Sequence, residues 1–326
     1  MPKEIVHWLV AERTADRLAD TAFGPAVRDC APCVLLAAVF HDALYYLRGA
    51  HPAALRKLPG VLHGQQGEDT YALLRLQLAH AAAAANERER LPRLAALVGL
   101  ASHIEADIVM HPAVYNLTGN YDDADPLRRT KAVQRHRLME SVMDIAACGG
   151  LAGLKKHTLA RLLHETGGGS AAALGNLFPL EQLARAQSEP VDRGAEAAFK
   201  LFGRLQSLYT HRLLARALYG LKNFLPDAVK ELVALFYAPQ LAPRARLFDA
   251  PVHYRHPVTD APGVFELHKA MDAAATTAAA LCRSLAPVLS GGAVTWAQGY
   301  SLSAGMPGIR AEQLTHYAAP PLFWDF

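Results

Sequence analysis

The pattern of apolar and polar residues along this chain is helical almost throughout. In residues 5–22, apolar side chains recur among charged ones at spacings that place most of them on one side of a helix. Similar patterns predict helices over residues 70–85, 91–112, 130–147, 179–189, 192–219, 225–237 and 264–288. The alternation typical of strands is nearly absent. The sequence therefore predicts an all-α, multihelical fold.

A glycine-rich stretch interrupts this helical pattern at residues 165–170. It reads Glu-Thr-Gly-Gly-Gly-Ser and lacks the Lys-Ser/Thr that follows the glycines of a phosphate-binding loop, so a connector is the favoured interpretation. Residues of the types that bind metals concentrate before residue 150. We therefore predict a metal-binding helical domain over 1–165 and a helical extension over 166–326 that packs against it.

The composition is typical of a globular helical protein. Hydrophobic residues make up 52% of the 326 residues and charged residues only 19%. The net charge is +3 without a dense Lys/Arg block, so no nucleic-acid partner is expected. Four cysteines are too few for a disulfide scaffold and favour a reducing compartment. Cys30 and Cys33 have the spacing of a redox dithiol, but buried thiols at a helix start are the favoured interpretation.

The N-terminal residues and the apolar runs bear on localisation. The first apolar stretch is broken by His7, Glu12 and Arg13, unlike a secretory signal, and no uninterrupted apolar run reaches the roughly 18 residues of a membrane span. We therefore expect a cytoplasmic protein. The amphipathic stretch 224–237 suits the protein core, with a peripheral membrane contact as the alternative. The sequence does not indicate an oligomeric state.

Two strings of metal-type ligands lie on the predicted helices 91–112 and 130–147. Their members are spaced four residues apart and read His103, Asp107, His111 and His136, Glu140, Asp144. Residues at this spacing differ by only about 40° around a helix axis, so each string lines one face. Imidazole and carboxylate together suit zinc and related first-row ions. Two strings so close in sequence predict a metal site better than any single histidine does.

Three further segments offer ligands. His7 lies on the first predicted helix, Asp42 follows a wholly apolar run, and His63 precedes a glycine at the start of the next helix. A carboxylate after such a run is costly to bury unless it is paired or bound to a metal. His41 is adjacent to Asp42 and should point elsewhere. For Asp144, the last member of the second string, we expect a role in orienting a ligating histidine.

Taken together, these residues resemble the zinc-dependent phospholipase C family. The resemblance covers roughly residues 1–150, and its motifs occur in the family's order: Pro2-Lys-Glu-Ile-Val-His7, Phe40-His-Asp42, His63-Gly64, His103-x3-Asp107-x3-His111-Pro112 and His136-x3-Glu140. Related proteins include the catalytic region of glycosylphosphatidylinositol phospholipase D and, more remotely, the P1-type nucleases. The resemblance implies an all-helical fold with a three-zinc cleft.

The resemblance also implies how the ligands divide. One zinc would be held by Asp42, His63, His103 and Asp107, and a second by His111, His136 and Glu140. Asp107 would also face a third zinc, completed by His7 and the main chain of a processed N-terminus. This chain begins with Met1-Pro2 shortly before His7, whereas secreted family members expose a new N-terminus by cleavage. Two or three Zn²⁺ ions are therefore expected.

The activity implied by the resemblance is hydrolysis of a phosphodiester, in a phospholipid headgroup or a small molecule. Zinc activates water and neutralises phosphate charge, and Asp42 is the candidate catalytic residue that orients or deprotonates the attacking water. Two alternatives stay open. Phe40-His41-Asp42 imitates the HD-type metal phosphohydrolases, which would make His41 a ligand. The chain could also be a metal-stabilised helical protein that binds lipid or a partner without catalysis.

Overall fold

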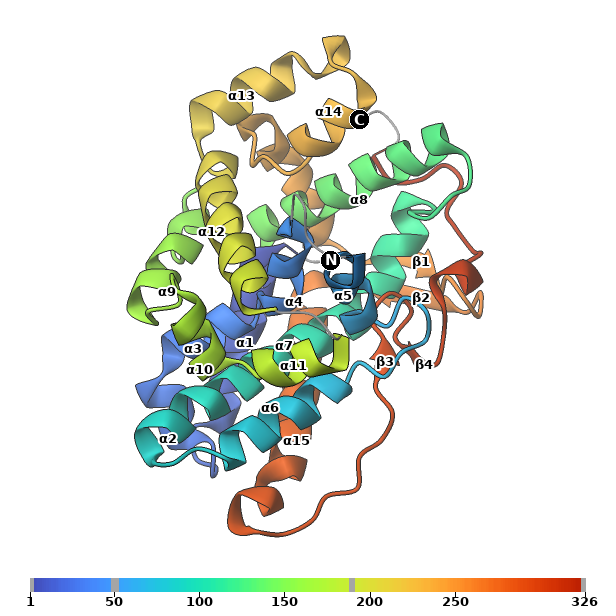
Figure 1. The fold of residues 1–326 in the computed structure, drawn as a ribbon. Coiled ribbons are helices and arrows are strands. Elements are labelled where there is room, and N and C mark those ends of the chain that lie inside the picture. The colour runs from blue at the N-terminus through green and yellow to red at the C-terminus, as the bar shows by residue number, and fades with distance from the viewer. Residues whose placement is uncertain (1–2, 48–52, 188–190, 324–326) are drawn as a thin grey trace.

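The computed structural model describes residues 3–47, 53–187 and 191–323, and most of them are helical (Figure 1). The α-helices are α1 (Glu4–Leu18), α2 (Gly24–Asp29), α3 (Ala31–Ala37), α4 (Phe40–Ala43), α5 (Ala53–Leu62), α6 (Ala72–Ala82), α7 (Glu87–Thr118), α8 (Pro126–Ala147), α9 (Leu159–Glu165), α10 (Ala171–Leu177), α11 (Leu180–Gln187), α12 (Asp192–Tyr209), α13 (Arg212–Gly220), α14 (Asp227–Val233) and α15 (Leu267–Leu285). Short 3₁₀ helices are η1 (Leu44–Tyr46), η2 (Gly153–Lys155), η3 (Lys222–Phe224), η4 (Pro239–Asp249), η5 (Ala286–Ser290) and η6 (Ala311–Gln313). The predicted all-α fold class is confirmed.

Helix α7 is the central element of the core. The side chain of Asn86 caps its start by accepting a hydrogen bond from the Glu89 N–H. Helices α1, α3, α6 and α15 pack around it (Figure 1). The approach to α3 is closest at Gly99, where a Cβ atom would lie 2.1 Å from the Val34 carbonyl oxygen. A larger residue at position 99 would therefore push the two helices apart.

Helix α7 continues past Pro112, where the sequence predicted its end. Proline has no N–H, so the Ile108 carbonyl loses its partner within the helix. The backbone of Gly305 lies beside that carbonyl; a Cβ at Gly305 would be 2.6 Å from the Ile108 oxygen. Every residue from Met110 to Thr118 is buried. This tertiary packing keeps the last turns helical despite the proline.

Two other predicted helices differ clearly from the structure. The helix predicted over 264–288 begins only at Leu267, because Pro262–Phe265 form a short strand. The helix predicted over 192–219 is two helices, because α12 ends at Tyr209 and the His211 side chain caps α13 by accepting the Leu214 N–H. The glycine-rich stretch is the turn between α9 and α10, with Ser170 capping α10. Helix α15 of the second half packs on α1 and α7 of the first half. The domain division at residue 165 stays a prediction.

Two short antiparallel strand pairs escaped the sequence analysis. Strand β1 (Val252–Arg255) pairs with β2 (Pro262–Phe265), and β3 (Tyr300–Ser301) pairs with β4 (Met306–Pro307). Both pairs lie on the side of the molecule marked β1–β4 in Figure 1. Strands of two to four residues are too short to show alternation in a sequence. The turn between β3 and β4 nevertheless matters, because Leu302 contributes to the site described below.

Two helical segments are long and apolar enough to cross a membrane by length and composition, namely Glu87–Thr118 and Leu267–Ser290. The apolar window of the first is 89% buried inside the protein, as in the core helix of a globular domain, and that of the second is 33% buried. Neither segment is an uninterrupted apolar run, because each contains charged residues. The core helix of a globular protein has the same length and composition as a membrane-spanning one.

Candidate metal centre

Helix α7 turns His103, Asp107 and His111 toward the protein interior on a single face. Their exposed fractions are 0, 0 and 1%. The His103 Nε2 lies 3.4 Å from Asp107 Oδ2, and the His111 Nε2 lies 3.7 Å from Asp107 Oδ1. The four-residue spacing therefore places a carboxylate between two imidazoles, with one oxygen toward each.

Four further segments bring the other predicted ligands to this face. In Figure 1, α4 and α5 are labelled close to α7 at the centre of the molecule and α8 crosses above them; α1, α4 and α8 contact α7. They carry His7 on α1, Asp42 on α4, His63 just after α5, and His136 and Glu140 on α8. The Nε2 of His7 lies 3.5 Å from Asp107 Oδ1, the Nε2 of His63 lies 3.4 Å from Asp42 Oδ1, and the Nε2 of His136 lies 3.1 Å from Glu140 Oε1.

The structure brings all eight predicted ligand residues together in three groups. Within each group the candidate ligand atoms lie within 4.8 Å of one another and every residue is buried: His7, His103 and Asp107; Asp42, His63 and His103; His111, His136 and Glu140. His103 belongs to two groups, and Asp107 also faces His63 and His111. These are buried clusters that could hold metal ions.

The spacing of the ligand atoms fits a shared cation. Tetrahedral ligands about 2.1 Å from an ion such as zinc lie about 3.4 Å from one another. Imidazole nitrogens of His7, His63 and His103 lie 3.4–3.5 Å from their nearest carboxylate oxygens. A direct charged hydrogen bond would be about 2.7–2.9 Å long. These pairs are therefore spaced as two ligands of one ion rather than as donor and acceptor.

Three of the histidines are held by main-chain carbonyls on the far side of the ring. The Nδ1 atoms of His63, His103 and His111 lie 2.6, 2.8 and 2.7 Å from the carbonyl oxygens of Pro59, Ala38 and Leu302. A carbonyl only accepts hydrogen bonds, so each Nδ1 carries the proton and donates it. The lone pair of each ring is then on Nε2, which faces the centre. Ligating histidines are usually oriented in this way.

Several ligand atoms have no hydrogen-bond partner within the part of the chain that the structure describes. They are Nε2 of His63, His103 and His111, Oδ1 of Asp42, and both carboxylate oxygens of Asp107. Leaving one buried polar atom unsatisfied costs about 1–3 kcal/mol, and more for a charged one. Bound cations would satisfy all of these atoms at once.

Burial and neighbouring charges set the protonation of the centre. Burial lowers the pKa of His136 to about 4 and that of His111 well below its usual range, so both rings are neutral and able to ligate near pH 7. Burial raises the pKa of Asp107, with His103 opposing it. Burial alone would lower the pKa of His103, but the carboxylates of Asp107 and Asp42 outweigh it and raise that pKa.

His41 lies beside the ligands and belongs to none of the three groups of described residues. Its ring is fully buried and stacks on His103, with centroids 4.3 Å apart and an interplanar angle of 1°. The His7 ring also stacks on His103, at 4.0 Å. His103 is therefore held between two other imidazoles. Both ring nitrogens of His41 are buried without a hydrogen-bond partner among the described residues, so the expectation that His41 points elsewhere than Asp42 stays a prediction.

The role predicted for Asp144 is wrong. Rather than orienting a histidine, Asp144 accepts hydrogen bonds from the Val6 N–H at 2.9 Å, the Ile5 N–H at 3.3 Å and the Tyr237 hydroxyl at 2.6 Å. One helical turn beyond Glu140, the α8 face meets the start of α1, whose free N–H groups attract a carboxylate. Asp144 thus fixes the helix that carries His7.

Aromatic residues around the centre were missed from the sequence. The rings of Tyr115 and Tyr121 lie 4.9 and 5.1 Å from the His136 ring, and Tyr45 lies 5.2 Å from the His63 ring. Tyr45 is 42% exposed, which places it at the solvent edge. Tyr115 follows His111 by four residues on α7, a spacing that could have revealed it. Tyr121 is in a loop, and no pattern marks it.

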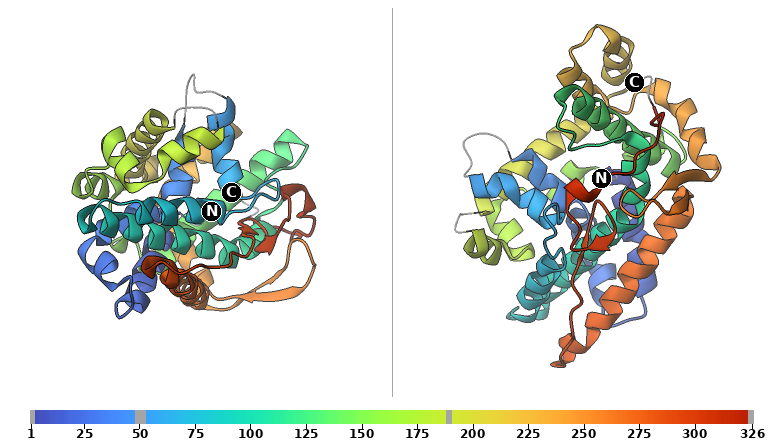
Figure 2. Two further views of the ribbon diagram at one scale, coloured as in Figure 1. Left: turned by 60° about the horizontal axis from the view of Figure 1, so that its bottom comes forward. Right: turned by 90° about the vertical axis from the view of Figure 1, so that its right-hand side faces the viewer.

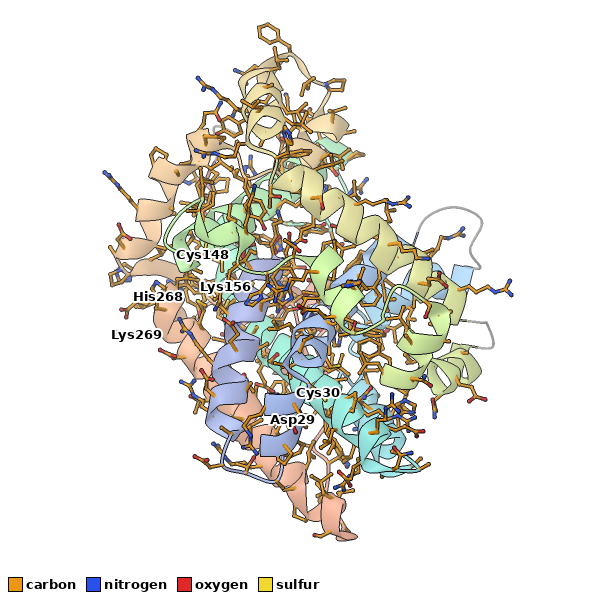
Figure 3. All side chains as sticks on the ribbon, turned by 90° about the vertical axis from the view of Figure 1, so that its left-hand side faces the viewer. Asp29, Cys30, Cys148, Lys156, His268 and Lys269 are labelled. Carbon is orange, nitrogen blue, oxygen red and sulfur yellow. The ribbon has the colours of Figure 1, made fainter. Side chains whose placement is uncertain are left out.

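The Cys30–Cys33 pair shows no sign of redox activation. Burial raises the pKa of both thiols, that of Cys33 to about 12, so neither is a ready thiolate. Cys30 lies next to Asp29, far from Cys148 (Figure 3). The main-chain ligand predicted at the N-terminus falls on Met1 and Pro2, which lie outside the described residues.

No family model, curated protein or solved structure matches this chain. What the site can do therefore follows from its own donors. Neutral imidazoles and carboxylates at these spacings suit several closely placed divalent ions, and such clusters serve displacement reactions at phosphorus.

Proposed function

We propose that this protein is a zinc-dependent phosphodiester hydrolase of the phospholipase C type. Its substrate would be a phosphodiester, in a phospholipid headgroup or a smaller molecule. The observation that carries the proposal is the position of Asp107. The two oxygens of this fully buried carboxylate lie 3.4–3.8 Å from imidazoles of all three groups: His7, His63, His103 and His111. A shared carboxylate of this kind is how several ions are held a few ångströms apart.

The division of the ligands supports the proposal. Asp42, His63 and His103, with Asp107 beside them, would hold one zinc, and His111, His136 and Glu140 a second. His7 and Asp107 would contribute to a third. The same division is the one that the resemblance to the phospholipase C family implies. Nitrogen and oxygen donors without thiolates also suit zinc in a catalytic setting.

When bound, the zinc ions would neutralise phosphate charge and make a water molecule acidic enough to attack near neutral pH. Asp42 is the most exposed of the eight ligands, at 8% against 4% or less for the others, so the centre meets solvent there. Its carboxylate would orient the attacking water and accept its proton. The hydroxyl of Tyr45, which is 42% exposed and lies beside His63, would donate a hydrogen bond to a phosphate oxygen.

A metal count and substrate assays test the proposal. Purified protein should contain two or three zinc ions, and anomalous scattering at the zinc edge should place them among the eight residues. Zinc-loaded protein should hydrolyse bis-p-nitrophenyl phosphate or phosphatidylcholine, and single-stranded nucleic acid serves as the comparison substrate. Tight zinc with no turnover of any of the three would contradict hydrolysis and favour a structural metal site.

Paired substitutions separate this proposal from an HD-type phosphohydrolase. We expect Asp42→Ala to lose bound zinc, because the Asp42 carboxylate faces the imidazoles of His63 and His103 in the same ligand group. His41→Phe should keep the full zinc count, because a phenyl ring preserves the stack on His103 while removing both ring nitrogens. Zinc content measured on both variants decides the matter. Equal loss from His41→Phe would favour the HD-type assignment.

A further inference from the structure

Large apolar side chains are exposed at one end of the molecule, in residues 208–232, which we call the apical segment. It comprises the end of α12, then α13, η3 and most of α14. The most exposed are Phe224 at 85%, Leu213 at 75% and Leu221 at 54%. Of the ten large apolar residues exposed in the described parts of the chain, six lie in this segment; the other three are Leu208, Val229 and Leu232. Such a concentration marks an interaction surface.

The apical segment protrudes from the body of the protein. Helices α13 and α14 form the top of the molecule in Figure 1 and in the right-hand view of Figure 2. The segment is held from below, because Ala215 and Tyr219 are buried and the Gln240 side chain donates a hydrogen bond to the Arg216 carbonyl. Leu213, Ala217 and Leu221 line a shallow depression together with Arg216 and Gln240. The exposed apolar side chains therefore lie at a protruding end of the molecule and face solvent.

The charge of the apical segment is net basic. Residues 208–232 contain four Lys or Arg and two acidic residues. Arg212 and Arg216 are exposed, and neither side chain forms an ion pair with any described residue. The two acidic residues of the segment are turned toward α8: Asp227 pairs with Lys131 at 3.1 Å, and Glu231 pairs with Arg137 at 3.5 Å. The outer surface is thus basic as well as apolar.

We propose that the apical segment docks this protein on an anionic lipid surface. Projecting phenyl and leucyl side chains reach the boundary of headgroups and acyl chains, while the arginines beside them meet lipid phosphates. Exposed arginines beside projecting apolar side chains are complementary to an anionic bilayer, which offers negative charge and apolar depth together. The inference stands on exposure and charge alone and does not depend on the metal centre.

Vesicle binding by the full chain tests this proposal. We expect the protein to co-float with vesicles that contain about one-third phosphatidylserine and to bind phosphatidylcholine vesicles at least tenfold more weakly. The double variant Leu221→Ala/Phe224→Ala should bind the anionic vesicles at least tenfold more weakly than the parent protein. Arg212→Gln/Arg216→Gln should lose about 30-fold, since each basic residue near the surface contributes about 1 kcal/mol, and this loss should shrink at high salt.

A matched control separates the segment from surface hydrophobicity in general. Val264 on β2 is 54% exposed, the same fraction as Leu221, and Val264→Ala should leave vesicle binding unchanged. Circular dichroism should show the same folded signal for all variants. Absence of binding to anionic vesicles, or an equal loss from Val264→Ala, would overturn the proposal. So would light scattering that shows a dimer dissociated by Leu221→Ala/Phe224→Ala, which would assign the surface to a second copy of the chain.

Discussion

The metal centre and the apical segment both reverse the usual distribution of side chains, in opposite senses. At the centre, eight ionisable residues are at most 8% exposed, whereas in the apical segment six large apolar residues are at least 37% exposed. A buried cluster of charges needs cations, and an exposed cluster of apolar side chains needs a surface to cover it. Each region is therefore incomplete without a different kind of partner.

The two regions also differ in how the chain builds them. The ligands of the centre come from five segments between His7 and Glu140, and the orientation of His111 depends on Leu302, far along the chain. The apical segment is a run of 25 consecutive residues whose outer side chains support nothing else. A change at the centre should consequently be felt at a distance, and a change at the apical surface should stay local.

The largest effect should come from removing the shared carboxylate. We expect Asp107→Ala to reduce zinc content and to lower hydrolysis by about 10³-fold, because metal stabilisation of the transition state amounts to several kcal/mol. Glu105→Gln is the control two residues away. Glu105 is buried as well but bonds to the Tyr71 hydroxyl at 2.7 Å, outside the three groups. Equal losses of zinc in both variants would show that helix disruption, not ligation, is being measured.

Acid should lower the free energy of unfolding of the metal-free protein, because His136 is buried in its neutral form. His136 has a pKa of about 4 in the folded chain against 6.5 when exposed. Between these two pH values the unfolded chain therefore binds more protons than the folded chain. Neutral His136 contributes fully to the free energy of unfolding above pH 6.5. This contribution, about 3 kcal/mol, is lost as the pH falls toward 4. Chelator-treated protein should be unfolded with urea at several pH values.

The readout is the difference between the parent protein and His136→Gln. Asp144 acts in the opposite direction, because burial raises its pKa to about 8 and it favours the folded state as the pH falls. This effect is common to both proteins and cancels in the difference. The stability of the parent should fall more steeply below pH 6.5 than that of the variant. Parallel curves would show that His136 is not held neutral by burial.

A smaller effect should follow from disturbing the support of one ligand. Gly305 has φ +62°, and a Cβ there would meet the Ile108 carbonyl at 2.6 Å. Gly305→Ala should shift the turn that carries Leu302, whose carbonyl accepts the His111 Nδ1–H. Loss of such support typically costs 10–100-fold in metal affinity. Zinc affinity by competition with a chromogenic chelator measures it.

Gly291→Ala is the matched control for backbone strain. Gly291 has φ +82°, but nothing lies within 4 Å of its hypothetical Cβ. It therefore carries a similar conformational cost without displacing a neighbour. We expect Gly291→Ala to lower stability slightly and to leave zinc affinity unchanged. A similar fall in affinity for both variants would mean that general destabilisation, not the position of Leu302, is responsible.

The contrast between the regions also shows what a sequence can reveal. The ligand strings on α7 and α8 were predictable because a four-residue spacing on a helix fixes which side chains share a face. Asp144 has the same four-residue spacing, but its carboxylate bonds to the start of α1 instead of a histidine. Spacing along one helix cannot predict this contact, because it depends on how α8 packs against α1.

Supports from the second half of the chain were not predictable at all. Leu302 acts through its carbonyl, which every residue has, so no side-chain pattern marks it. The short strands that position it have no measurable alternation. Only residues 224–232 of the apical segment fall within the amphipathic stretch 224–237. The core was favoured for that stretch, because spacing shows which residues share a face and not whether another element covers it; Phe236 and Tyr237 are buried, whereas Phe224 and Leu232 are exposed.

The smallest effect should be on stability at the apical surface. Phe224 is 85% exposed, so Phe224→Ala removes little buried area, and the free energy of unfolding should change by no more than about 0.5 kcal/mol. Phe199 is fully buried against Phe178 and Phe40, and Phe199→Ala should cost about 3–5 kcal/mol. Urea unfolding of both variants compares the free energy lost at an exposed and at a buried phenylalanine. A large loss from Phe224→Ala would place this residue within the folded core and remove the reason to seek a surface that covers it.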